Sequence, residues 1–158
     1  VNATALEVYD RENQAAQIRT AEQLARTHVL FFLFRGDCPY CQQFAPLLKS
    51  FEQKFGLPVF AISVDGGTLP EFPRARVDNG IAATLNVTQV PALFLASPRT
   101  NVITPLGYGV LSETELLERL QVIATPAANA AAATPTLPVD LAAYVARLDD
   151  EMAKTGDA

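Results

Sequence analysis

The amino-acid sequence predicts an α/β fold in which a central mixed β-sheet is flanked by helices. Three apolar runs, residues 29–34, 58–64 and 90–96, have the length and composition of buried strands. A stretch with helical spacing of apolar residues separates the first two runs, and a turn and a further strand-like run follow the third. A strand–helix–strand unit followed by a hairpin and a closing helix is typical of a mixed sheet with helices on its faces.

Residues 1–27 are predicted to be an N-terminal extension that contains a helix. Residues 5–9 fit a short strand or a lead-in, and Asp10 has the character of an N-cap for a helix that continues to about Thr27. The apolar stripe of this helix has the spacing of one helical face and comprises Ile18, Ala21, Leu24 and Ala25.

Residues 28–123 are predicted to form the main domain. After the strand at 29–34, an amphipathic helix is expected from Gln42 to Phe55, with Gly56 as its stop. Residues 66–80 form a long loop rich in proline and glycine, which suggests function or mobility.

The second half of this domain is predicted to hold a short helix, a hairpin and a closing helix. The short helix is expected at residues 81–86, and the strand at 90–96 pairs with residues 102–106. Residues 112–115, Ser-Glu-Thr-Glu, form a capping box that opens a helix to about Ile123.

Residues 124–138 are rich in alanine and proline and are predicted to be a linker, followed by a C-terminal helix in residues 139–158. We expect the linker to be mobile, and deletion from Pro126 onward to leave a folded domain. The terminal helix has two interpretations, packing on its own domain or binding a partner. Its apolar residues at helical spacing are Leu141, Tyr144, Val145, Leu148 and Met152.

The sequence Cys38-Pro39-Tyr40-Cys41 contains the only two cysteines of the 158-residue chain. Because the motif lies between a strand and a helix, Cys38 is expected at the helix N-terminus, where free N–H groups and the helix dipole stabilise a thiolate. Cys41 is expected one turn inside the helix, shielded from solvent, where it can attack a mixed disulfide formed by Cys38. We therefore expect Cys38 to be the more exposed and more readily deprotonated thiol of a redox centre.

Three other interpretations of the cysteine pair are less well supported. A closed zinc site would need carboxylates, because His28 is the only histidine and the chain has no further cysteine. A purely structural disulfide would close a very small loop and would stabilise the fold little. Two inert buried thiols would fit a continuous apolar run, whereas aspartate, glycine and proline flank this pair.

Composition excludes several classes of function. The net charge of −5 and the lack of a basic patch beyond Arg74 and Arg76 argue against nucleic-acid binding. No apolar run approaches the length of a membrane span. Val1 is not a natural start, so the absence of a signal peptide is uninformative. A single cysteine pair with no spare thiol suits an oxidising compartment.

Four segments together resemble a known family. The order of predicted elements over roughly residues 28–123 resembles the thioredoxin fold. More specifically, the chain is similar to the redox-competent members of the TraF and TrbB group of F-type conjugative transfer proteins. The segments that carry this resemblance are residues 34–41, 63–67, 90–95 and 106–109.

The resemblance implies a role for each residue of the site. Cys38 would be the exposed nucleophile and Cys41 the resolving thiol. Pro91 would be a cis-proline that faces the disulfide. The residues expected to contact a client protein are Pro39, Tyr40, Val90 and Pro91.

The chain departs from the thioredoxin pattern at one position that matters for proton transfer. Thioredoxins carry a buried aspartate six residues before the first cysteine, and this chain has Phe32 there. Water or Asp37 would then serve as proton acceptor. A glycine-rich stretch for holding glutathione, which glutaredoxins need after the cis-proline, is absent from the sequence.

The resemblance thus implies a periplasmic thiol–disulfide oxidoreductase, an oxidase or isomerase rather than a reductase, that needs no cofactor. Its clients would be cysteine-containing proteins of a conjugative pilus or type IV secretion apparatus, with a membrane redox protein as recycling partner. The alternative is a thioredoxin-fold scaffold that binds partners of the apparatus and has only secondary redox activity.

Overall fold

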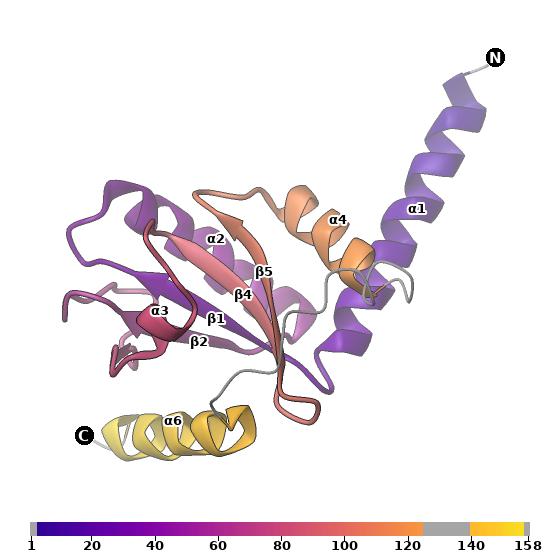
Figure 1. Ribbon diagram of the computed structural model, residues 1–158. Coiled ribbons are helices and arrows are strands. Elements are labelled where there is room, and N and C mark those ends of the chain that lie inside the picture. Colours follow the sequence, from indigo (N-terminus) through magenta and orange to yellow (C-terminus); the bar gives the residue numbers. More distant parts are fainter. Residues whose placement is uncertain (1–2, 125–139, 157–158) are drawn as a thin grey trace.

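The computed structural model describes residues 3–124 and 140–156. Its centre is a five-stranded mixed sheet with the strand order β3-β2-β1-β4-β5. Strands β1, β2 and β3 run parallel to one another, whereas β4 is antiparallel to both β1 and β5. Figure 1 shows helices on both faces of this sheet. The arrangement is the predicted thioredoxin-like α/β fold.

The strands differ only slightly from their predicted bounds. They are β1 (Val29–Phe34), β2 (Val59–Ser63), β3 (Arg76–Val77), β4 (Ala92–Ser97) and β5 (Val102–Tyr108). Strand β3 lies in the stretch predicted as a loop, where two residues pair with the end of β2. Strand β4 begins after Pro91 rather than at Val90, and β5 continues to Tyr108, beyond the predicted end.

The central strand β1 is buried on both faces of the sheet. Its side chains alternate between two apolar clusters, with Leu30, Phe32 and Phe34 in one and Val29, Phe31 and Leu33 in the other. This alternation follows from the two-residue period of a strand. An almost uninterrupted apolar run is therefore the sequence of a strand covered by helices on both sides.

Helices α2 (Pro39–Phe55) and α4 (Glu113–Ala124) contribute to the first cluster. The apolar residues on one face of α2 lie in this cluster or pack against it, and Gly56 ends the helix with the left-handed φ of 78° expected of a stop. The predicted capping box of α4 is confirmed, because the Glu115 N–H donates to Ser112 Oγ and the Ser112 N–H to Glu115 Oε1.

Helix α1 spans Ala3–Leu24, so the prediction that Asp10 caps its start was wrong. Residues 5–9 are helical as well, because alanine, leucine and glutamate favour a helix and nothing in this segment interrupts it. The predicted stripe is confirmed, since Ala21 is fully buried and Ile18, Leu24 and Ala25 pack against the first cluster. The N-terminal half of α1 extends away from the sheet (Figure 1) and is exposed.

The opposite face of the sheet is covered by α3 (Ile81–Thr84) and α6 (Leu141–Gly156). Leu141, Tyr144 and Leu148 of α6 are buried in the second cluster, and Tyr144 meets Phe31 edge to face with ring centres 5.7 Å apart. Of the two interpretations of the terminal helix, packing on its own domain is confirmed. The expectation that deletion from Pro126 onward leaves a folded domain stays a prediction, and the deletion would remove a helix that is packed on the sheet. The linker was predicted at 124–138, but Ala124 is the last residue of α4, and residues 125–138 lie outside the described residues, as does the side chain of Met152.

Candidate redox site

Cys38 and Cys41 lie at the start of α2, at the carboxyl end of β1. Cys38 is the N-cap residue, with extended backbone angles, and Pro39 occupies the first helical turn, where its missing N–H costs nothing. The Cys38 sulfur accepts a hydrogen bond from the backbone N–H of Cys41 over 3.1 Å. A thiolate at this sulfur would therefore receive a hydrogen bond as well as the positive end of the helix dipole.

The two sulfurs have different surroundings. Cys38 is partly exposed, whereas Cys41 is completely buried, which confirms the predicted order of exposure. Burial, and then the hydrogen bond with Cys38, raises the pKa of Cys41 to about 12. One thiol is thus accessible to a partner, and the other stays protonated and shielded behind it.

The loop before β4 lies against the accessible sulfur. The Val90–Pro91 peptide bond is cis, as predicted, and the Val90 carbonyl oxygen is 4.0 Å from the Cys38 sulfur. Pro91 is buried, and its carbonyl accepts from the Gly109 N–H over 2.7 Å, which ties the start of β4 to the end of β5. The structure therefore brings Val90 and Pro91 together with the cysteine motif, although they are about fifty residues apart in sequence.

The residues between the cysteines face solvent. Pro39 is exposed, and the side chain of Tyr40 is 65% exposed. The site is consequently exposed at the residues between the cysteines, and the Val90 carbonyl lies against the Cys38 sulfur. All six residues predicted from the sequence lie in this one region.

No carboxylate lies in the core at the position of Phe32. This side chain is fully buried, with its ring 5.5–5.7 Å from the rings of Phe34, Phe44 and Phe72. Asp37, one of the two proton acceptors suggested by the sequence, accepts hydrogen bonds from Arg35 with both of its oxygens, at 3.0 and 3.2 Å.

Sequence reasoning overlooked Asp65, which follows β2 and is held against the turn before Cys38. Its Oδ1 accepts hydrogen bonds from the N–H groups of Gly36 and Gly67, both at 2.9 Å. These two bonds, in that order, lower the pKa of Asp65 to about 2. The signal in the sequence was an aspartate and two glycines directly after a buried strand, at the edge of the sheet where the cysteines also lie.

His28 lies at the opposite end of β1 from the cysteines, and its Nδ1 is paired with Thr27 Oγ1 over 2.7 Å. Among the described residues, no three His, Cys, Asp or Glu side chains are grouped closely enough to hold a metal ion. Within residues 3–124 and 140–156, no helix combines the length and apolar character needed to cross a bilayer.

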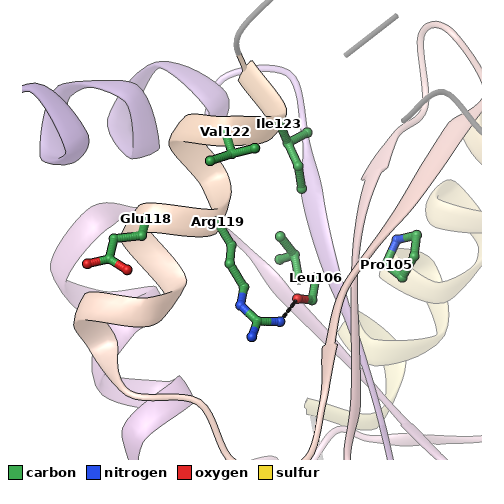
Figure 2. Close-up of a pocket in the computed structure, with 6 residues that line it drawn as sticks. All are labelled: Pro105, Leu106, Glu118, Arg119, Val122 and Ile123. Carbon is green, nitrogen blue, oxygen red and sulfur yellow. Dashed lines mark hydrogen bonds between the residues drawn. The ribbon is translucent and has the colours of Figure 1, made fainter. Parts of the chain in front are cut away.

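A separate pocket lies between β5 and α4 and contains none of the predicted site residues (Figure 2). Arg119 reaches across it and donates a hydrogen bond to the carbonyl of Leu106. The arginine thus links α4 to β5. The other residues that line the pocket are Pro105, Glu118, Val122 and Ile123.

Comparison with known proteins identifies the family of the chain. The model of the family "TraF: F plasmid transfer operon protein" matches residues 1–121. Protein TraF of Escherichia coli K12 is 35% identical over 107 residues, which are 68% of this chain and 43% of that protein. Protein TrbB of the same strain is 33% identical over 104 residues, 63% of this chain and 57% of that protein. The chain thus spans about half the length of these relatives.

Two solved structures are similar over part of the chain. MTB dsbF has a TM-score of 0.45 and 23% identity, covering 63% of this chain and 83% of its own. StoA from Bacillus subtilis has a TM-score of 0.43 and 16% identity, covering 59% of this chain and 81% of its own.

The match to the family model over residues 1–121 includes both the cysteine motif and the Val90–Pro91 loop. The chain therefore belongs to the TraF family of F plasmid transfer operon proteins.

Proposed function

We propose that this protein is a periplasmic thiol–disulfide oxidoreductase that acts on cysteine-containing proteins of a conjugative pilus or type IV secretion apparatus. The observation that carries the proposal is the asymmetry of the cysteine pair. Cys38 is partly exposed at the N-terminus of α2, and Cys41 is buried one turn further along with a pKa of about 12. Family membership supports the link to conjugative transfer.

The proposed reaction is thiol–disulfide exchange through a mixed disulfide at Cys38. In the reducing direction, the Cys38 thiolate attacks a client disulfide, one client sulfur bonds to Cys38, and the other leaves as a thiolate. Cys41 then loses its proton and attacks the Cys38 sulfur, which forms the Cys38–Cys41 disulfide and releases the second client thiolate. In the oxidising direction the same steps run backwards. Both need only the two cysteines, and a membrane redox protein would regenerate the starting form.

A client is proposed to bind as an extended segment against Val90 and Pro91, with Pro39 and Tyr40 at the side. The Val90 carbonyl lies 4.0 Å from the reacting sulfur, and an extended chain can pair with exposed backbone groups. The exposed ring of Tyr40 would add apolar contact next to the mixed disulfide.

Trapping the mixed disulfide tests this proposal. Cys41→Ser removes the resolving thiol, so covalent client adducts on Cys38 should accumulate in the periplasm of cells that carry the transfer system, and reductant should cleave them. Cys38→Ser is the matched control and should give far fewer adducts. If neither variant captures any protein, the pair does not act on clients.

Titration against glutathione tests the direction of the reaction. We propose an oxidase or isomerase, which corresponds to a reduction potential of about −120 to −180 mV. A value close to that of thioredoxin, roughly −270 mV, would instead indicate a reductase.

A scaffold function is the second candidate, and the exposed start of α1 favours it. Leu6 and Tyr9 are 56% and 68% exposed on the part of the helix that extends away from the sheet (Figure 1). If the scaffold function dominates, replacement of both cysteines by serine should leave pilus assembly intact, whereas deletion of the protein should abolish it.

A further inference from the structure

Asp65 joins the loop after β2 to the turn between β1 and α2. Its side chain is only 20% exposed, and its Oδ1 accepts from the N–H groups of both Gly36 and Gly67. Ser63 Oγ lies 3.3 Å from the same oxygen and 2.7 Å from the Gly67 carbonyl. Because a hydroxyl has one hydrogen, Ser63 donates it in the shorter contact, to the Gly67 carbonyl. The donors to Asp65 Oδ1 are then the two backbone N–H groups.

The two glycines allow the segments to meet backbone to backbone. A Cβ placed on Gly36 would lie 2.6 Å from Gly67 Cα, and one placed on Gly67 would lie 2.5 Å from Gly36 Cα. Both distances are far below van der Waals contact, and the opposing atoms belong to backbones that have no side-chain freedom to yield. The Asp65 bonds and the glycine contact therefore depend on each other.

Gly36 is also held from its other side, by the helix that carries the cysteines. Its carbonyl accepts from Gln42 Nε2 over 3.0 Å, and the turn closes with a hydrogen bond from the Cys38 N–H to the Arg35 carbonyl over 3.3 Å. The peptide groups just before Cys38 are thus fixed by the loop after β2 on one side and by α2 on the other. Any movement of Gly36 would change where the Cys38 sulfur lies relative to the Cys41 N–H.

The charge of Asp65 suits it to this structural role and not to that of a base. Hydrogen bonds from Gly36 and Gly67 lower its pKa to about 2, so it remains ionised at every physiological pH. Its Oδ2 lies 4.0 Å from Arg35 Nη2, which directs part of its charge to the guanidinium group. A carboxylate with such a low pKa is a poor acceptor for a thiol proton.

We propose that Asp65 is a positioning residue for Cys38, which it serves by holding Gly36 against Gly67 and so keeping the nucleophilic sulfur at the N-terminus of α2. This inference rests on the proposed redox function and adds a residue to its site. Loss of these contacts weakens the hydrogen bond between the Cys38 sulfur and the Cys41 N–H, and Cys38 then reacts more slowly with an alkylating reagent.

The test is the alkylation rate of Cys38 at pH 7 in a Cys41→Ser background, which keeps the backbone N–H at position 41. Asp65→Ala should lower the rate about threefold to tenfold, the factor that corresponds to one ordinary hydrogen bond. Asp65→Asn keeps an oxygen acceptor for both glycines and should stay within about twofold of the parent. Gly67→Ala leaves every charge in place but pushes on Gly36, and should lower the rate as Asp65→Ala does.

Asp78→Ala is the matched control. Asp78 also accepts two backbone hydrogen bonds through one oxygen, from Gly80 and Ala82 at 3.1 Å each, but they fix the start of α3 and not the cysteine turn. In this variant the alkylation rate of Cys38 should stay within about twofold of the parent. A drop equal to that of Asp65→Ala would mean that general loosening of the fold, not the hold on Gly36, controls Cys38.

Two further results would overturn the inference. Unchanged rates in both Asp65→Ala and Gly67→Ala would show that the contact of Gly36 with Asp65 and Gly67 does not affect Cys38. A loss in Asp65→Asn equal to that in Asp65→Ala would show that only the charge of Asp65 affects the rate. If Asp65→Ala and Gly67→Ala do not fold, Gln42→Ala provides a further variant. It removes the hydrogen bond from Gln42 to the Gly36 carbonyl at an exposed position of α2, and it should also lower the alkylation rate of Cys38. No change there overturns the inference as well.

The assay uses no client, so the two proposals can fail separately. Failure of client capture by Cys41→Ser with the predicted alkylation pattern would reject the proposed function alone. Normal capture with unchanged alkylation in the Asp65 and Gly67 variants would reject the positioning role alone.

Discussion

Helix α6 should contribute a large part of the stability of this domain. Tyr144 is 4% exposed and packs its ring edge against Phe31, a residue of the central strand, and Leu141 and Leu148 are buried beside it. The helix is also anchored at its start, where the Leu141 N–H donates to Asn101 Oδ1 over 2.7 Å. We therefore expect Tyr144→Ala to uncover part of one face of the sheet.

The expected loss can be estimated from these contacts. Truncation of a buried aromatic side chain to alanine costs about 3–5 kcal/mol in a closed core. Tyr144 is on a terminal helix that can adjust, so we expect the low end, about 3 kcal/mol. For a chain of this size that corresponds to a fall in Tm of roughly 6–12 °C. Deletion from Asp140 onward removes, among the described residues, the buried side chains of Leu141, Tyr144 and Leu148 at about 1.5–3 kcal/mol each, and should cost more than the point substitution.

Thermal unfolding followed by circular dichroism, together with urea unfolding, measures this loss. Ala143→Ser is the matched control, because Ala143 lies on the exposed side of the same helix and the change should stay within about 0.5 kcal/mol. A Tm unchanged by both Tyr144→Ala and the deletion would refute the reasoning, since it would mean that α6 leaves the sheet face in solution.

Four further predictions concern the redox site. Phe32→Asp should lower the free energy of unfolding, measured in urea, by about 3 kcal/mol or more, because it buries a carboxylate among aromatic rings. The control Phe32→Leu should lower it by less than about 3 kcal/mol, and equal losses would contradict the prediction. The Asp65 pKa of about 2 lies below the ordinary value of about 3.9, so its contribution to stability is present above about pH 3.9 and is lost as the pH falls towards 2. Asp65→Asn should therefore lose less stability than the parent between pH 4 and pH 2 in denaturant titrations, and parallel curves would count against the assignment. In the single-serine variants, Cys38 should be alkylated faster than Cys41 at pH 7, and the reverse order would overturn the assignment of nucleophile and resolving thiol. The rate at which Cys41 resolves a mixed disulfide should rise about tenfold per pH unit between pH 7 and pH 9 in stopped-flow measurements, because its pKa of about 12 keeps the thiolate scarce; a plateau below pH 8 would argue against burial as the cause.

Most of the fold and the cysteine geometry could be predicted because they depend on local patterns. The strand β1 is a continuous apolar run that only burial on two faces explains, and α2 carries an apolar stripe that ends at Gly56. The position of Cys38 at a helix N-terminus follows from the few residues around it. The resemblance to a family was needed for the residues expected to contact a client, above all Val90 and Pro91, which lie far along the chain.

The features that escaped prediction depend on contacts between distant segments. Strand β3 is two residues long and exists because Arg76 and Val77 lie beside the end of β2. The role of Asp65 depends on Gly36, 29 residues earlier, and in the sequence alone Asp65 and the glycines after it have the composition of an ordinary turn. The early start of α1 has a different cause, since its first turns are exposed and lack the apolar stripe by which helices are identified.

The buried surroundings of Cys41 determine which group can accept its proton during the proposed reaction. In the proposed reaction this thiol must lose its proton to attack Cys38, yet Phe32 occupies the place of a buried acceptor. Asp65, whose charge acts on Cys41, has a pKa of about 2 and takes up a proton poorly. Solvent is therefore left to take the proton, and because hydroxide becomes more abundant as the pH rises, this agrees with the expected increase of the resolving rate with pH. Resolution then depends on how close the mixed disulfide lies to Cys41, which makes the hold of Asp65 on the Cys38 turn a determinant of both chemical steps.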